Sequence, residues 1–167
     1  MTTPLMLEMA SEIRIKTRRL RRQMTSFPGR TRYLRLLVPL AMLAILATGC
    51  LSAEAVYSLQ KVNVSRDASG IPPVYEHSTL SAKAQSWAET LAARGRLSHS
   101  NISSGVGPGW STLGENLSQA TSVDSAHSIF LSSSSHRNTM LNGAYSHIGV
   151  GIAYAGPHIY VVHVYGG

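Results

Sequence analysis

Hydrophobic positions follow a helical period through the middle of the chain. From Ser78 onward the apolar residues recur three or four positions apart, at Leu80, Ala84, Trp87, Ala88 and Leu91. This spacing predicts a helix that buries one face against a core. A similar pattern begins after Thr121 or Ser122, and a looser one begins near Glu54. The pattern therefore predicts three amphipathic helices.

The end of the chain has a period of two. Apolar and small residues alternate from Ile148 to Tyr154, and the run from Ile159 to Tyr165 is apolar at almost every position. Ala155 to Pro157 supply a turn between them, which predicts two paired strands. A strand that is apolar on both faces belongs to a sheet covered on both sides. We expect an α+β fold over residues 54–167, a three-layer α-β-α sandwich with a mainly antiparallel sheet.

Charge is concentrated near the N-terminus. The 167 residues carry a formal charge of +7, but the first 50 hold nine basic and two acidic residues, whereas the rest hold six of each. The predicted domain is therefore neutral, and the basic balance does not indicate nucleic-acid binding. We expect no nucleic-acid partner.

The basic segment leads into an apolar run from Leu36 to Ala47. A positive start followed by about a dozen apolar residues and then small residues predicts a secretory or lipoprotein signal segment over residues 1–50. The run is shorter than the roughly 20 residues of a membrane span. Our hypothesis for the start codon is Met24, which gives a positive segment of ordinary length. Arg18 and Arg19 lie far from the apolar run, which disfavours twin-arginine export.

Cys50 is the only cysteine, which excludes an intramolecular disulfide. Its place after Ala47-Thr48-Gly49 resembles a bacterial lipobox, whose cysteine is lipidated and becomes the mature N-terminus. The alternative is cleavage after Ala53 or Ala55, with Cys50 an ordinary small residue nearby. Both interpretations predict a domain that is secreted or anchored to the outer face of the cytoplasmic membrane. Membrane contact is expected only through the signal segment or a lipidated Cys50.

Two histidines and a glutamate stand in separate loop-like stretches. His99 follows the end of the second predicted helix, Glu115 lies between Gly and Asn, and His136 follows the run Ser132 to Ser135. Each has an ordinary local interpretation, as a helix-end or surface histidine or as a turn carboxylate. Spacings of 16 and 21 residues fit no local ligand motif. Serine–histidine catalysis is disfavoured, because no Gly-x-Ser-x-Gly elbow and no acid partner is identifiable.

Four motifs, taken in order, carry a resemblance to a known family. They are Leu-Ser-His at 97–99, Gly-Glu-Asn-Leu at 114–117, Phe-Leu-Ser-Ser-Ser-Ser-His-Arg-Asn-Thr-Met-Leu at 130–141, and Ile-Gly-Val-Gly-Ile-Ala at 148–153. From about Glu54 to Gly166 the chain resembles the CAP superfamily (cysteine-rich secretory protein, antigen 5, pathogenesis-related-1, or SCP-like) in its compact bacterial form. The family fold agrees with the predicted sandwich. Asn63, Arg66 and the turn 70–73 take family positions that we interpret as scaffold.

The resemblance implies that His99, Glu115 and His136 converge in one cleft. Two imidazoles and a carboxylate are a set that can hold zinc or another divalent cation. Longer family members have a second glutamate where this chain has Ser133, the fourth predicted cleft residue. The missing carboxylate should weaken metal binding and leave fewer groups for acid–base work.

Three classes of function follow from the resemblance. Family members bind sterols or other lipids, partner proteins or cell surfaces, so the favoured prediction is a non-catalytic module that binds a lipid, a cell-envelope ligand or a protein partner. One alternative is a metal-dependent hydrolase with Glu115 as base and His99 and His136 as ligands. The other is a structural envelope protein with a vestigial cleft. Because one fold hosts many functions, no residue is assigned as catalytic. We favour a protein that is not an enzyme.

Overall fold

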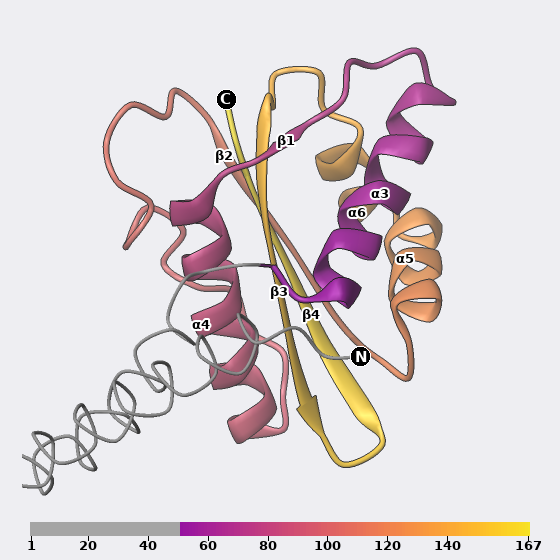
Figure 1. Ribbon diagram of the computed structural model, residues 1–167, viewed down its shortest axis with the longest axis vertical. Helices are drawn as coiled ribbons and strands as arrows, with labels where there is room; N and C mark the ends of the chain where they lie inside the picture. The colour runs from indigo at the N-terminus through magenta and orange to yellow at the C-terminus, as the bar shows by residue number, and fades with distance from the viewer. Residues whose placement is uncertain (1–50) are drawn as a thin grey trace, which may run out of the picture. The chain divides into compact units, whose positions relative to one another are not determined.

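The computed structural model describes residues 51–167, and the predictions for residues 1–50, including Met24 and Cys50, lie outside the described residues. Figure 1 shows the helices and strands of this compact part of the chain. In order they are α3 (Ala53–Asp67), β1 (Tyr75–Glu76), α4 (Ser78–Arg94), β2 (Leu113–Ala120), α5 (Val123–Ser132), α6 (Ser134–Met140), β3 (His147–Ala155) and β4 (His158–Gly166). The three predicted helices and the two predicted strands are all present.

The described strands form one sheet in the order β1-β3-β4-β2. β3 and β4 form the expected antiparallel hairpin, β2 pairs antiparallel with β4, and the short β1 pairs parallel with the start of β3. At the hairpin turn Gly156 has a φ of 58°, a conformation that glycine adopts without steric cost. The mainly antiparallel sheet that we expected is confirmed.

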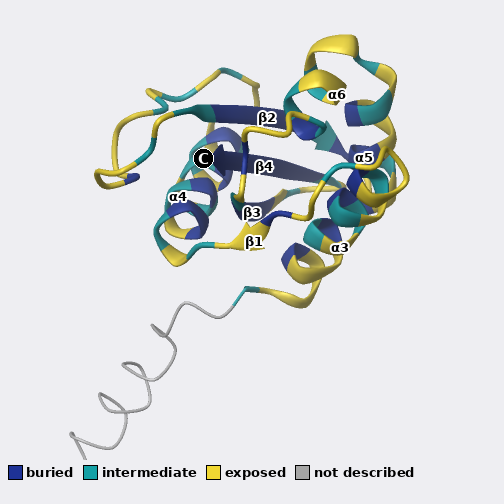
Figure 2. Cartoon of the chain, turned by 90° about the horizontal axis from the view of Figure 1, so that it is seen from above, coloured by how far each residue is buried: buried dark blue, intermediate teal, exposed yellow. Residues whose placement is uncertain are grey.

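Helices cover both faces of the sheet. α4 lies on one face, whereas α3, α5 and α6 lie on the other (Figure 1). Figure 2 shows β2, β3 and β4 as largely buried strands between these two helical layers. Each layer has its own apolar cluster, one that includes Leu80, Leu91 and Val162 and one that includes Phe130 and Ile148. The predicted α-β-α sandwich is therefore confirmed.

Two glycines of β3 set how closely α4 approaches the sheet. A Cβ at Gly149 would overlap the backbone at Leu80, and a Cβ at Gly151 would overlap the backbone at Ala84. The alternating glycines of the strand are thus the positions over which α4 lies. Any side chain there must push the helix away from the sheet, because interiors are close-packed.

The ends of the helices match the sequence in part. Ser122 caps α5 through a reciprocal capping box with Ser125, and Gly95 ends α4 with a φ of 66°. At the start of α4, His77 occupies the cap position and makes no side-chain capping bond. The backbone N–H of His77 instead bonds to Ile148 in β3, which fixes the start of the helix.

The scaffold interpretation of Arg66 and Asn63 is confirmed. Arg66 is fully buried, and its guanidinium donates to the backbone oxygens of Pro72, Met140, Asn142 and Tyr145. The side chain of Asn63 bonds to both the N–H and the C=O of Val74. These contacts tie the end of α3 to the segments before β1 and before β3.

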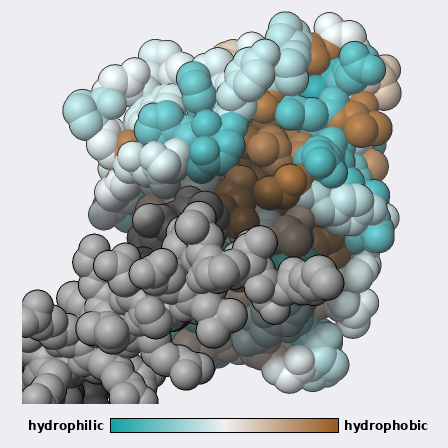
Figure 3. Space-filling view, in the orientation of Figure 1, coloured by the Kyte–Doolittle hydropathy of each residue, from teal (hydrophilic) through white to brown (hydrophobic). Residues whose placement is uncertain are grey.

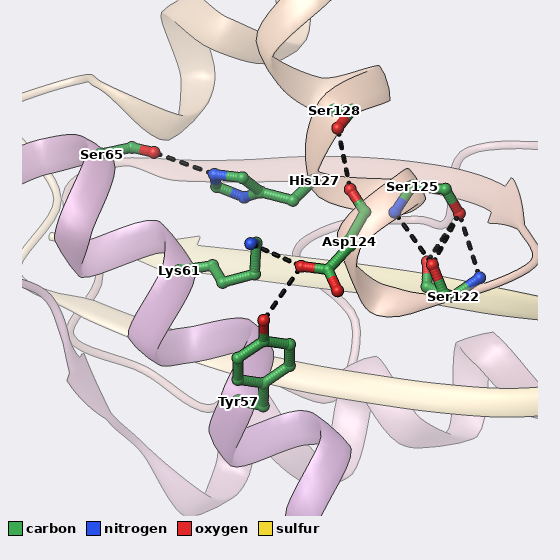
Figure 4. Close-up of polar contacts among 8 residues, drawn as sticks. All are labelled: Tyr57, Lys61, Ser65, Ser122, Asp124, Ser125, His127 and Ser128. Carbon is green, nitrogen blue, oxygen red and sulfur yellow. Dashed lines mark hydrogen bonds and ion pairs between the residues drawn. The ribbon is translucent and has the colours of Figure 1, made fainter.

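A polar seam joins α3 to α5 (Figure 4). Asp124 of α5 accepts from the Tyr57 hydroxyl at 3.0 Å and pairs with the Lys61 ammonium at 2.6 Å. Farther along, Ser65 bonds to His127 at 2.9 Å. Because α6 follows α5 after a single residue, this seam also helps to fix the position of α6.

Candidate functional site

Glu115 lies in the strand β2, and not in the turn that we expected. It pairs with Val164 of β4, and its side chain is only 3% exposed. Alternate residues of β2 face opposite layers, so Glu115 shares its face with Leu117, which packs in the α4 cluster. Asn116 faces the opposite layer and bonds to α6.

The carboxylate of Glu115 is held by three hydrogen bonds. Oε1 accepts from Nδ1 of His99 at 2.7 Å and from the backbone N–H of Ser100 at 3.0 Å. Oε2 accepts from the Ser100 hydroxyl at 2.7 Å. A buried carboxylate needs such partners to offset its lost hydration. Both oxygens are therefore engaged, and the pair fixes the orientation of the His99 ring, whose side chain is 65% exposed.

His136 approaches from the opposite side of β2. It lies in α6 and not in a loop, its backbone oxygen accepts from the Asn116 amide at 2.8 Å, and its ring packs edge-on against Phe130. Burial lowers the pKa of His136, and the charge on His99 lowers it further. The two rings therefore lie within electrostatic reach of each other, and His136 is neutral at physiological pH.

Ser133 does not join these side chains by a hydrogen bond. It is the single residue between α5 and α6, and its hydroxyl bonds to that of Ser135 at 3.0 Å. The structure thus joins His99 and Glu115 directly, whereas the side chains of His136 and Ser133 are hydrogen bonded to neither of them. We call the group His99, Ser100, Glu115 and His136 the His99 site.

The His99 site does not provide three side chains arranged for a metal ion. Within residues 51–167 no group of three or more His, Cys, Asp or Glu residues is placed to hold one. The Glu115 carboxylate is instead hydrogen bonded to Ser100 and His99. Zinc or another divalent cation held by His99, Glu115 and His136 stays a prediction.

A hollow of about 470 Å³ lies beside the His99 site. Ser100 lines it together with Lys83, Trp87 and Ser104. The indole N–H of Trp87 donates to the backbone oxygen of Ser98 at 2.9 Å, which holds the ring in one orientation. The site is therefore flanked by a surface of mixed polarity, with serine hydroxyls, a lysine and one fixed aromatic wall.

Sequence reasoning missed two residues of this region. Ser100 supplies two of the three hydrogen bonds to Glu115, and Asn116 holds α6 at His136. Each lies next to a predicted site residue in the chain, which is the only signal that the sequence offers for them. Elsewhere in the domain, Ser58 and His163 form a serine–histidine hydrogen bond. Both residues are buried in the core, so this pair is not accessible to solvent.

Trp110 acts as a loop anchor in the segment that leads to β2. Its indole N–H donates to the backbone oxygen of Val106 at 2.9 Å, and its ring packs against His77 and His147. This fixes the long loop between α4 and β2, which carries Ser100 at its start.

The α-β-α sandwich places the chain in the class of SCP-like domains. The chain belongs to the CAP (Cysteine-rich secretory protein) family, whose model matches residues 59–165. A comparison with curated proteins gave no match. The resemblance that the sequence motifs carried is therefore confirmed.

Solved structures share this fold. An outer surface protein from Borrelia burgdorferi has a TM-score of 0.59 and 16% identity, with 65% of this chain and 87% of that one covered. An extracellular protein containing an SCP domain from Bacillus anthracis has 0.56 and 18%, with 71% and 44% covered. A cysteine-rich secretory protein from Staphylococcus aureus has 0.58 and 18%, with 68% and 38% covered. This chain spans less than half of the last two proteins.

None of the helices described between residues 51 and 167 is long and apolar enough to cross a membrane.

Proposed function

We propose that this chain is an extracytoplasmic CAP-domain binding module that takes a ligand at the His99 site without catalysing a reaction. The observation that supports this most is the state of Glu115, whose two oxygens both accept hydrogen bonds from Ser100 and His99. These bonds fill three of the about four acceptor positions of a carboxylate, which leaves little of Glu115 for a metal ion or for accepting a proton from substrate. Glu115 instead acts as the partner that orients His99.

The ligand contacts would come from the two imidazoles and the neighbouring hollow. Since Nδ1 of His99 donates to the Glu115 carboxylate, which only accepts, Nε2 is the ring nitrogen left for a ligand. The hollow adds the Ser104 hydroxyl and the Trp87 ring. A surface of this composition fits the polar part of a cell-envelope component, a lipid head group or a partner protein better than a bare hydrocarbon chain.

A hydrolase has no comparable support. In the described part of the chain neither His99 nor His136 is hydrogen bonded to a hydroxyl that an imidazole could activate. The pair Ser58 and His163 is buried, so no substrate can reach it. These contacts favour binding over nucleophilic catalysis.

An extracytoplasmic location is supported by two observations. The sequence has a basic segment followed by an apolar run and Cys50, which is typical of exported chains. Two of the similar structures belong to proteins described as an outer surface protein and as an extracellular protein. We propose that this chain is likewise secreted or anchored outside the cytoplasmic membrane.

The test is ligand retention by the full chain. The protein is incubated with lipid and cell-envelope extracts, reisolated, and its bound molecules are identified by mass spectrometry. We expect one defined ligand, with retention about tenfold lower in His99→Ala and Glu115→Gln, because each loses an oriented hydrogen bond. Asp67→Asn, at an exposed carboxylate of α3, is the control and should retain the ligand fully. Absence of any ligand, or equal retention in all variants that fold, contradicts the proposal.

A further inference from the structure

A second surface, unrelated to the His99 site, lies where the chain enters the domain. It is a groove of about 340 Å³ between the start of α3 and α4. Its apolar lining comes from Leu51, Ala55, Ala82, Val150, Ile152 and Tyr154, and its polar lining from Ser52, Glu54, Ser78, Ser81 and Gln85. Figure 3 shows hydrophobic residues gathered in the middle of this face, between α4 and α3. No lysine or arginine lines the groove. An apolar surface of this kind on a monomer indicates a site of interaction.

The floor of the groove is the edge of β3, but it is not open to another strand. β1 pairs only with His147 and Ile148, so among the described residues the rest of β3 has a partner on one side alone. The Gln85 amide fills part of the other side, since it donates to the Ile152 oxygen and accepts from the Ile152 N–H, both at 3.0 Å. A side chain in this position blocks strand addition. An extended peptide is therefore a poor occupant.

The path of the chain points to a different occupant. Leu51 lines the groove, and Ser52 caps α3 by accepting from the Ala55 N–H at 3.1 Å. Only Leu51 separates Cys50 from this cap, and the apolar run of the sequence ends at Ala47. A lipid on Cys50 would therefore hold the groove near the membrane surface, because a single residue separates Cys50 from the cap of α3.

The rim has the composition of a membrane interface. Tyr154 is 62% exposed, and its hydroxyl donates to the Glu54 carboxylate at 3.1 Å. Val56, on the first turn of α3, is 40% exposed. Tyrosine rings with an apolar body and a polar tip are enriched where hydrocarbon meets water. Because Glu54 carries negative charge, a zwitterionic phosphatidylcholine surface, which has no net charge, suits this rim better than an anionic one.

We propose that the groove face docks on the lipid bilayer that holds residue 50, with Leu51 and Tyr154 at its interface and the buried Val150 and Ile152 beneath them. This rests on the anchored form of the proposed function, and it extends the membrane contact from Cys50 alone to a face of the domain. The sheet order places β2 at the edge opposite β3, about 10 Å away. The docked domain therefore directs Glu115 and His99 away from the membrane, where a ligand of the cell envelope can reach them.

Hydrogen–deuterium exchange of the full chain tests the docking. The chain is expressed in a bacterium that processes lipoproteins, reconstituted with phosphatidylcholine vesicles, and compared with the vesicle-free protein by mass spectrometry. We expect exchange in residues 51–57 and 150–155 to slow about tenfold with vesicles, while residues 97–100 and 113–117 exchange unchanged. Tyr154→Asp should abolish the slowing. Ile129→Asp, which alters a 38% exposed apolar residue of α5, is the matched control and should preserve it.

Each other outcome overturns the docking. A chain that floats with vesicles but shows no slowing is anchored without docking, which leaves the proposed location and the ligand site intact. A chain that does not float at all removes both the anchored location and the docking, but not the ligand site. Slowing without vesicles that grows with protein concentration would identify a second copy of the chain as the occupant.

Discussion

Acid will destabilise this domain through His163, and the size of the effect follows from its burial. His163 is fully buried, with Nε2 bonded to Ser58 and Nδ1 bonded to Tyr165. Burial, with a smaller contribution from the charge on His127, lowers its pKa to about 3. In the unfolded chain the ring takes up a proton near the ordinary value of 6.5. The stability that His163 contributes is therefore fully present above pH 6.5 and is lost as the pH falls from 6.5 toward 3.

The magnitude comes from proton linkage. With pKa values of 6.5 unfolded and about 3 folded, the free energy of unfolding drops by about 2 kcal/mol between pH 7.5 and pH 5. Substitution His163→Gln removes the titration but keeps an amide that can bond to Ser58. His127 and His136 have lowered pKa values too, but they remain in both proteins, so the difference between the proteins isolates His163.

The assay is urea unfolding at pH 7.5, 6 and 5 for the wild type, His163→Gln and the control His158→Gln at the hairpin turn. We expect the wild type and the control to lose about 2 kcal/mol more than His163→Gln over this range. An identical pH dependence in His163→Gln would refute the argument, because it would mean that the buried ring accepts a proton in the folded state.

Three further predictions concern the scaffold and the second histidine. Arg66→Met removes the donors to four backbone oxygens and should lower the free energy of unfolding by about 3 kcal/mol; a loss below 1 kcal/mol in urea unfolding would contradict this. Gly149→Ala should cost about 2 kcal/mol because it drives the sheet from α4, whereas Gly143→Ala, with open space around it, should not. His99→Ala should raise the pKa of His136 in an NMR titration, since the charge on His99 helps to lower it. An unchanged pKa would show that the two rings do not interact electrostatically.

The regular spacing of apolar residues was enough to predict much of the fold. Helices α3, α4 and α5 and the hairpin of β3 and β4 follow from apolar spacing, because burial of one face or of both faces leaves that pattern in the chain. The glycines at 149 and 151 interrupt the strand pattern, and the structure shows why: α4 lies directly over them. Local pattern and global packing agree in these elements.

The strand β2 was missed for a physical reason. Its buried positions include Glu115, Asn116 and Ser118, which are polar and do not produce an alternation of apolar residues. Their burial is compensated by partners such as Ser100 and the backbone of His136, which lie elsewhere in the chain. A pattern of hydrophobicity cannot register such compensation.

The family resemblance identified the site residues, but it did not predict how they are arranged. Spacing could not show that His99 bonds to Glu115, because the contact depends on β2 lying beside the end of α4. The short helix α6 was hidden in a run of serines, which are typical of turns. The groove beside Leu51 was not expected at all, since its walls come from α3, α4 and β3.

The central claim is that the Glu115 carboxylate accepts hydrogen bonds from Ser100 and His99 and does not bind a metal ion. Zinc titration calorimetry on the chelator-stripped full chain tests this claim most directly. The comparison includes the wild type, His136→Ala and Glu115→Gln. The account predicts no one-to-one zinc binding that depends on both His136 and Glu115, because the carboxylate is already engaged. One-to-one binding in the wild type that disappears in both variants would contradict it, since Glu115 would then leave Ser100 and act as a metal ligand.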